Sequence, residues 1–78
     1  MKNTFEKFAE LNYNIDDFYA IRFMGGKVYL QGNATEKVID KYQQLGYNFK
    51  FDSENKWLDS TLLMDDLTIV ITLILSDN

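Results

Sequence analysis

The amino-acid sequence predicts an α+β fold with an antiparallel β-sheet of about five strands, one main amphipathic helix packed on one face, and a short N-terminal helix. Three observations predict this fold. Residues 67–75 form an uncharged run rich in β-branched residues, which suits a buried strand. Gly25-Gly26 stands between two strand-like segments, and one helical stripe ends at Gly46. The predicted order is α-β-β-α-β-β-β in a single α+β domain, residues 1–78.

Residues 3–12 predict the short N-terminal helix. Asn3 can cap this helix, and Glu6 stands where its side chain completes a capping box. Phe5, Phe8 and Ala9 share one face at helical spacing. Because an isolated helix of this length is marginal in water, we expect it to dock on the rest of the domain or to fray.

The Gly25-Gly26 pair predicts a hairpin, because a two-residue turn of this composition accepts the positive φ angles that primed turns need. A turn at this position fixes the register of its two strands. The opposed pairs are then Phe23 with Val28, Ile21 with Leu30, and Arg22 with Tyr29. The first two pairs are apolar and the third can form a cation–π contact on the other face, so the register is self-consistent.

The main helix is expected from Asn33 to Leu45, with Asn33 as N-cap, Glu36 at N3 and Gly46 just past its end. Its apolar stripe consists of Ala34, Val38, Ile39, Tyr42 and Leu45.

Three strands are expected to follow, at residues 47–52, 57–64 and 67–75. The turn over 53–56 and a two-residue turn at Asp65-Asp66 set their registers. The expected pairs are Asp52–Trp57, Lys50–Asp59, Met64–Leu67, Leu62–Ile69, Ser60–Ile71 and Leu58–Leu73.

Alternation divides the sheet residues between two faces. The helix-facing side is expected to carry Tyr19, Ile21, Phe23, Val28, Leu30, Tyr47, Phe49, Phe51, Leu58, Leu62, Ile69, Ile71 and Leu73. The opposite side is expected to carry Phe18, Ala20, Arg22, Met24, Tyr29, Lys50, Trp57, Asp59, Thr61, Leu63, Val70, Thr72 and Ile74. This second side is too apolar to leave in water. Three covers are considered: the N-terminal helix with Phe5 and Phe8, a second copy in a symmetric homodimer, or a different protein anchored at Trp57.

The composition predicts a protein that is not an enzyme and that holds no cofactor or metal. His and Cys are both absent, which removes the commonest general base, the thiol nucleophile and the usual transition-metal ligands. The acidic pairs at 16–17 and 65–66 are expected in turns, where Asp is favoured. The net charge of −4 argues against direct nucleic-acid binding.

Nothing in the sequence predicts a membrane protein. The apolar run at 67–75 is about half as long as a membrane-spanning helix. No basic leader with a cleavage site is present, and without Cys an oxidising compartment is not required. We therefore expect a small acidic cytoplasmic protein.

The function predicted from these features is that of a non-catalytic protein-binding module, which inhibits a larger protein such as a nucleic-acid enzyme by occluding a basic groove. Small Cys-free domains rich in Lys, Asn, Asp and Ile are similar to accessory proteins of phages and mobile elements. The residues predicted to bind the partner are Asp16, Asp17, Tyr29, Asp52, Glu54, Trp57, Asp65 and Asp66. The alternatives are a homodimeric structural or assembly protein that uses its spare sheet face, and a single-stranded nucleic-acid-binding regulator.

Overall fold

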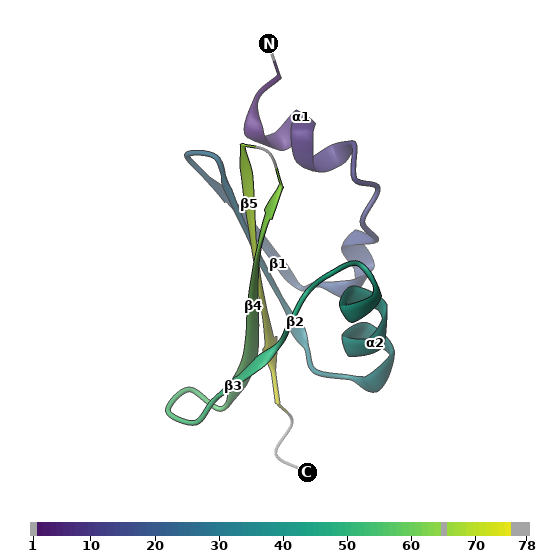
Figure 1. The fold of residues 1–78 in the computed structure, drawn as a ribbon, viewed down its shortest axis with the longest axis vertical. Coiled ribbons are helices and arrows are strands. Elements are labelled where there is room, and N and C mark those ends of the chain that lie inside the picture. The colour runs from purple at the N-terminus through teal and green to yellow at the C-terminus, as the bar shows by residue number, and fades with distance from the viewer. Residues whose placement is uncertain (1, 65, 76–78) are drawn as a thin grey trace.

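The computed structural model describes residues 2–64 and 66–75 and shows an α+β fold with two α-helices and a five-stranded sheet (Figure 1). A short 3-10 helix, η1, lies between the first helix and the first strand. The elements in chain order are α1 (Thr4–Ala9), η1 (Ile15–Asp17), β1 (Ala20–Met24), β2 (Lys27–Asn33), α2 (Glu36–Gln44), β3 (Lys50–Asp52), β4 (Trp57–Met64) and β5 (Leu67–Ile74).

The sheet is mixed, so the prediction of a purely antiparallel sheet is wrong. Its strand order is β1-β2-β5-β4-β3, in which β2 and β5 run parallel and the other neighbours run antiparallel. Strand β5 is apolar on one face and half-apolar on the other. A strand of this kind is best shielded from water in the centre of a sheet. Strand β5 therefore inserts between β4 and β2, and its direction makes the contact with β2 parallel.

The η1 turn changes the predicted order of elements and the face assigned to Phe18. Asn14 caps this turn by accepting a hydrogen bond from the Asp16 backbone N–H at 3.0 Å. Phe18 follows at its C-cap, is buried, and has its ring 5.3 Å from that of Tyr42 on the helix side of the sheet. Tyr19 is instead exposed. The assignment of Phe18 to the opposite face was wrong because β1 begins at Ala20, so strand alternation does not extend back to this residue.

Helix α1 confirms the capping box, although it ends at Ala9. The Asn3 side chain accepts from the Glu6 N–H at 2.8 Å, and the Glu6 side chain accepts from the Asn3 N–H at 3.2 Å. The helix docks rather than frays. Phe8 is buried, and the Phe5 ring lies 5.5 Å from that of Phe23.

Helix α2 begins two residues later than predicted, and Asn33 is not its N-cap. Thr35 holds that position and accepts a hydrogen bond from the Val38 N–H at 3.2 Å through its hydroxyl. Asn33 is instead the last residue of β2, where it pairs with Ile74. The helix ends at Gln44, and Gly46 follows the C-cap residue as expected.

All predicted strand registers are confirmed, including the hairpin at Gly25-Gly26, whose φ angles are +47° and +84°. Strand β3 is shorter than predicted, because only residues 50–52 pair with β4.

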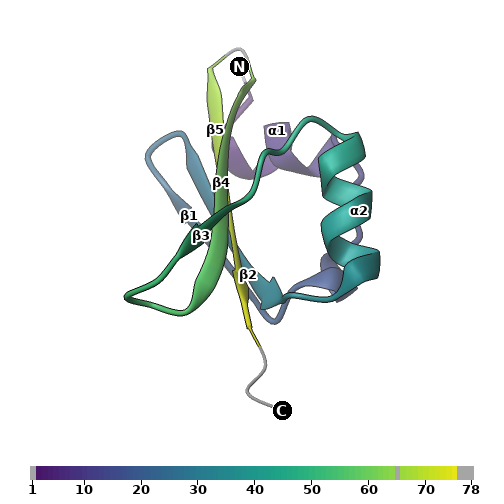
Figure 2. The same cartoon turned by 60° about the horizontal axis from the view of Figure 1, so that its bottom comes forward.

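The core lies on one side of the sheet, where both helices pack (Figures 1 and 2). Six side chains there have no exposed surface: Val28, Leu30, Tyr42, Ile69, Ile71 and Leu73. The space between α2 and the sheet is filled by aromatic rings, with Tyr42 in contact with Tyr13, Phe18 and Tyr47. Because α1 lies on the same side as α2, it does not cover the opposite face, which excludes one of the three covers considered.

Candidate functional site

The face of the sheet turned away from α1 and α2 is called the open face below. Paired residues point to the same side of a sheet, and alternate residues of one strand share a side. The open-face residues are therefore Ala20, Arg22, Met24, Lys27, Tyr29, Gln31, Asn33, Lys50, Asp52, Trp57, Asp59, Thr61, Leu63, Thr68, Val70, Thr72 and Ile74. Within residues 2–64 and 66–75, no segment crosses this face (Figures 1 and 2).

The centre of the open face is uncharged. The middle strand β5 contributes Thr68, Val70, Thr72 and Ile74 to it. The charges stand on either side of this row. The β1–β2 flank carries Arg22 and Lys27, whereas the β4–β3 flank carries Lys50, Asp52 and Asp59. An uncharged centre between charged flanks is the usual anatomy of a protein interface.

Apolar side chains run across the open face from end to end. Trp57 lies opposite Ile74, and Val70 lies between Tyr29 and Thr61; Trp57, Tyr29, Val70 and Ile74 are all partly exposed. At the other end, Met24 is 53% and Leu63 is 75% exposed. Among the described residues, only neighbours within the sheet shield these apolar side chains, because nothing packs on top of them.

Trp57 forms a corner of the open face with two acidic residues. Its indole N–H donates a hydrogen bond to the Asp59 carboxylate at 3.2 Å. Asp52 pairs with Trp57 across the strands and accepts hydrogen bonds from the Glu54 and Asn55 backbone N–H groups at 3.0 and 3.1 Å. A hydrogen bond from the Asn55 side chain, together with those backbone bonds, holds the pKa of Asp52 below its ordinary value. Asp52 is therefore negatively charged at neutral pH.

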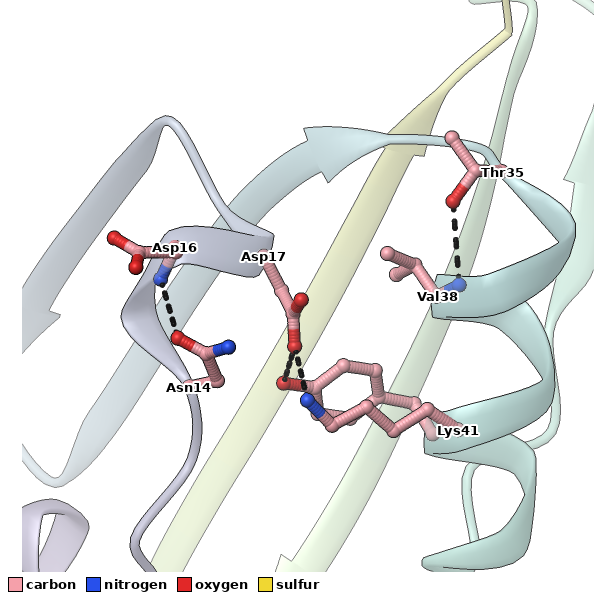
Figure 3. Close-up of polar contacts among 7 residues, drawn as sticks. Asn14, Asp16, Asp17, Thr35, Val38 and Lys41 are labelled. Atoms are coloured by element: carbon pink, nitrogen blue, oxygen red, sulfur yellow. Dashed lines mark hydrogen bonds and ion pairs between the residues drawn. The ribbon is translucent and has the colours of Figure 1, made fainter.

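Asp17 lies in a different place and has a structural role (Figure 3). Its carboxylate is 11% exposed and accepts hydrogen bonds from the Lys41 ammonium at 2.7 Å and the Tyr42 hydroxyl at 2.8 Å. Burial alone would raise the pKa of Asp17. The hydrogen bonds from Lys41 and Tyr42 and the positive charges of Lys41 and Lys37 outweigh burial and lower this pKa. Asp17 thus ties η1 to α2.

A group of tyrosines lies beside Asp17, and none of them is suited to acid–base catalysis. The hydroxyls of Tyr13 and Tyr47 are 3.0 Å apart. Burial raises the pKa of Tyr13, Tyr42 and Tyr47, and the hydrogen bond to Asp17 raises that of Tyr42 further. A general base needs a pKa near neutrality, whereas these phenols stay protonated far above it. Their hydroxyls stabilise the core.

The eight residues predicted to bind the partner do not form one surface. Asp52, Glu54 and Trp57 gather at one corner of the open face, and Tyr29 lies on the same face two strands away. Asp66 is ion-paired with Lys7 beyond the other end of β4, about 26 Å away for a strand of eight residues. Asp16 is exposed on η1 and Asp17 is partly buried against α2. Asp65 lies outside the described residues.

The predicted site leaves out the two large apolar residues that are most exposed on the open face, Leu63 and Met24. The same alternation that places Trp57 on this face also places these two residues there. Strand position, and not residue type, is therefore the signal in the sequence that identifies them.

The described part of the chain holds no group of three or more His, Cys, Asp or Glu side chains that could bind a metal ion. None of its helices is long and apolar enough to cross a membrane. Comparisons with protein-family models, curated proteins and solved structures find no match to this chain. The functional argument therefore rests on the geometry of the open face.

Proposed function

We propose that this chain is a non-catalytic protein-binding module and that the open face is its docking surface. The observation that carries the proposal is the uncovered row of apolar side chains across the sheet, with Leu63 and Met24 more than half exposed. Each large apolar side chain that a partner covers contributes about 1.5–3 kcal/mol when fully buried. Large apolar side chains left uncovered on one face of a soluble protein mark interaction sites.

The size of the open face suits a protein partner. Strands lie about 4.8 Å apart and residues rise about 3.3 Å each, so five strands around an eight-residue centre span up to about 600 Å². Covering that area removes about 1,200 Å² in total, the lower end of the range for specific interfaces. The hollow on this face, lined in part by Arg22 and Tyr29, is shallow, whereas small-molecule sites enclose most of their ligand.

The charges on the two flanks define the partner's chemistry. The β1–β2 flank presents Arg22 and Lys27, which an acidic surface complements. The Trp57 corner presents two acids, Asp52 and Asp59, beside one base, Lys50, so its excess of negative charge is complemented by basic groups. The partner is accordingly a larger protein with an apolar strip between an acidic and a basic side. The contact with a basic groove that the sequence predicts is therefore proposed for the Trp57 corner alone.

The proposal is tested by cross-linking in the native cells with tagged wild-type chain and a Leu63→Glu variant. Wild type should be recovered covalently bound to a partner protein, and Leu63→Glu should lose that species. A matched control is Leu45→Glu, because Leu45 is 49% exposed on α2 and not on the open face. Cross-linking that Leu63→Glu leaves unchanged, or loss with Leu45→Glu alone, contradicts the proposal.

A second copy of the chain is the second candidate occupant, and the uncharged middle strand of the open face favours it specifically. A two-fold axis parallel to β5 would lay the β1–β2 flank of one copy over the β4–β3 flank of the other. The row of Thr68, Val70, Thr72 and Ile74 would then meet itself. Sedimentation of the purified chain separates the two candidates. A dimer that the Leu63→Glu change dissociates supports self-assembly. A chain that stays monomeric at all concentrations supports a larger protein as the partner.

A further inference from the structure

The two edges of the sheet differ in how well they are protected against added strands. Strand β3 covers one edge only beside residues 57–59 of β4, and two of its three residues are the charged Lys50 and Asp52. Short edge strands and charged side chains are the usual protection. Strand β1 closes the other edge with five residues, of which Arg22 alone is charged. Within the described chain, the backbone of β1 is hydrogen-bonded only to β2.

The hairpin geometry identifies the free backbone groups of β1. The two-residue turn at 25–26 makes Met24 and Lys27 a hydrogen-bonded pair. Since hydrogen-bonded and non-hydrogen-bonded pairs alternate along antiparallel strands, the N–H and C=O groups of Ile21 and Phe23 point away from β2. These backbone groups can hydrogen-bond to an added strand, because β1 has β2 on one side and no described strand on the other.

Apolar surface flanks this edge on both sides of the sheet. On the helix side, Phe23 is 38% and Phe5 is 60% exposed, and an apolar groove lined by Phe5, Phe8 and Ile15 starts beside them. On the open face, Met24 is exposed, and a shallow hollow is lined in part by Arg22 and Tyr29. An added strand would place alternate side chains over these two depressions.

We propose that β1 binds an extended segment of another protein by strand addition, and that this segment carries an acidic residue opposite Arg22 between apolar neighbours. Backbone hydrogen bonds to Ile21 and Phe23 supply the pairing, and Arg22 selects the acid. Arg22 stands between the two hydrogen-bonding positions, so it forms a non-hydrogen-bonded pair with a strand added in the antiparallel direction. In such pairs the facing side chains are closest.

The charge of Arg22 also argues against a second copy at this edge. An antiparallel pair of β1 strands that uses the free groups of both Ile21 and Phe23 brings Arg22 opposite Arg22 of the copy. Like charges directly opposite each other destabilise a strand pair. A foreign segment with an acid at that position has no such penalty.

The test selects short random peptides from a display library on the immobilised full chain. Wild type should enrich Pro-free sequences with Asp or Glu flanked by β-branched or aromatic residues. An Arg22→Glu variant should enrich Lys or Arg at the same position. The matched control is Lys50→Glu on the β3 edge, which should leave the wild-type consensus unchanged.

A second measurement tests the backbone pairing without altering the protein. The best selected peptide is synthesised with N-methyl groups on its odd residues or on its even residues. Methylation of the residues whose N–H groups face β1 should weaken binding about tenfold per lost bond, and methylation of the others should leave it nearly unchanged. Equal effects of both series, no enriched peptide, or an acidic consensus that survives Arg22→Glu would each overturn the proposal.

Discussion

Trp57 of β4 lies directly opposite Ile74 of β5 on a face of the sheet that no described part of the chain covers. Both side chains are shielded only from the side. One strand position further, Leu58 opposes Leu73, which has no exposed surface because the helices pack above it. The same two strands thus have one face buried under the helices and one face exposed to solvent. Four predictions follow from this difference and from the packing of the core.

Neighbouring leucines on β4 should respond very differently to the same change. Leu62 packs against the core, whereas Leu63 is 75% exposed on the open face. We expect Leu62→Thr to lower the free energy of unfolding by about 1–3 kcal/mol and Leu63→Thr to change it by less than about 0.5 kcal/mol. Urea denaturation of both variants checks this. Equal losses would mean that the open face is covered.

Asp17 should contribute to stability in a way that its neighbour Asp16 does not. The carboxylate of Asp17 is bonded to Lys41 and Tyr42, whereas Asp16 is exposed. We expect Asp17→Asn to cost about 1–3 kcal/mol, because the variant leaves the Lys41 charge without its partner. Asp16→Asn should stay within about 0.5 kcal/mol. A comparable cost for both changes in thermal or chemical unfolding is incompatible with the Asp17 contact.

Stability should fall at both ends of the pH range, for opposite reasons. The pKa of Asp17 is lowered in the folded chain, so its contribution is present above the unfolded value, about 3.9, and is lost as the pH falls further. The pKa values of Tyr42 and Tyr47 are raised, so their contribution is full below about pH 10 and is lost as the pH rises. Urea midpoints between pH 2 and 12 measure both limbs. Tyr47→Phe should flatten the alkaline limb, and an unchanged slope would contradict the burial of this phenol.

Gly32 should tolerate no side chain. A Cβ atom added there would lie 2.7 Å from the Asp17 backbone oxygen and 3.2 Å from the Phe18 ring. We expect Gly32→Ala to cost about 2 kcal/mol or more, because the clash is with backbone and with a buried ring. The control is Gln31→Ala on the open face, which should change stability by less than about 1 kcal/mol in the same denaturation series. A Gly32→Ala variant as stable as wild type would show that η1 does not lie against β2.

The strand registers could be predicted from the sequence because two local signals agree. The turn at Gly25-Gly26 and the alternation of apolar residues both place Phe23 opposite Val28, and the structure confirms this. The start of α2 was ambiguous, because Asn33 and Thr35 are both good N-caps. Pairing of Asn33 with Ile74 in the sheet settles the choice, and that contact depends on residues 41 positions apart.

The neighbour of β5 and the position of α1 could not be predicted for a similar reason. The apolar residues of β5 fit beside any neighbouring strand, whether it runs parallel or antiparallel. Alternation therefore does not show that β2 runs parallel to β5. The apolar face of α1 suits either side of the sheet. A hydrogen bond from the Gly26 N–H to the Thr4 hydroxyl holds α1 on the side of α2. The open face was therefore identified as a surface from the sequence, but its lack of a cover was not.

Solvent exposure of individual methyl groups tests the central claim most directly. A soluble paramagnetic agent added to dilute, methyl-labelled protein should strongly broaden the NMR signals of Leu63, Val70 and Ile74. The signals of Ile69 and Ile71 should stay sharp, because these residues of the same strand have no exposed surface. If Val70 and Ile74 are as protected as Ile69 and Ile71 at every protein concentration, the chain covers its own open face and the docking surface does not exist.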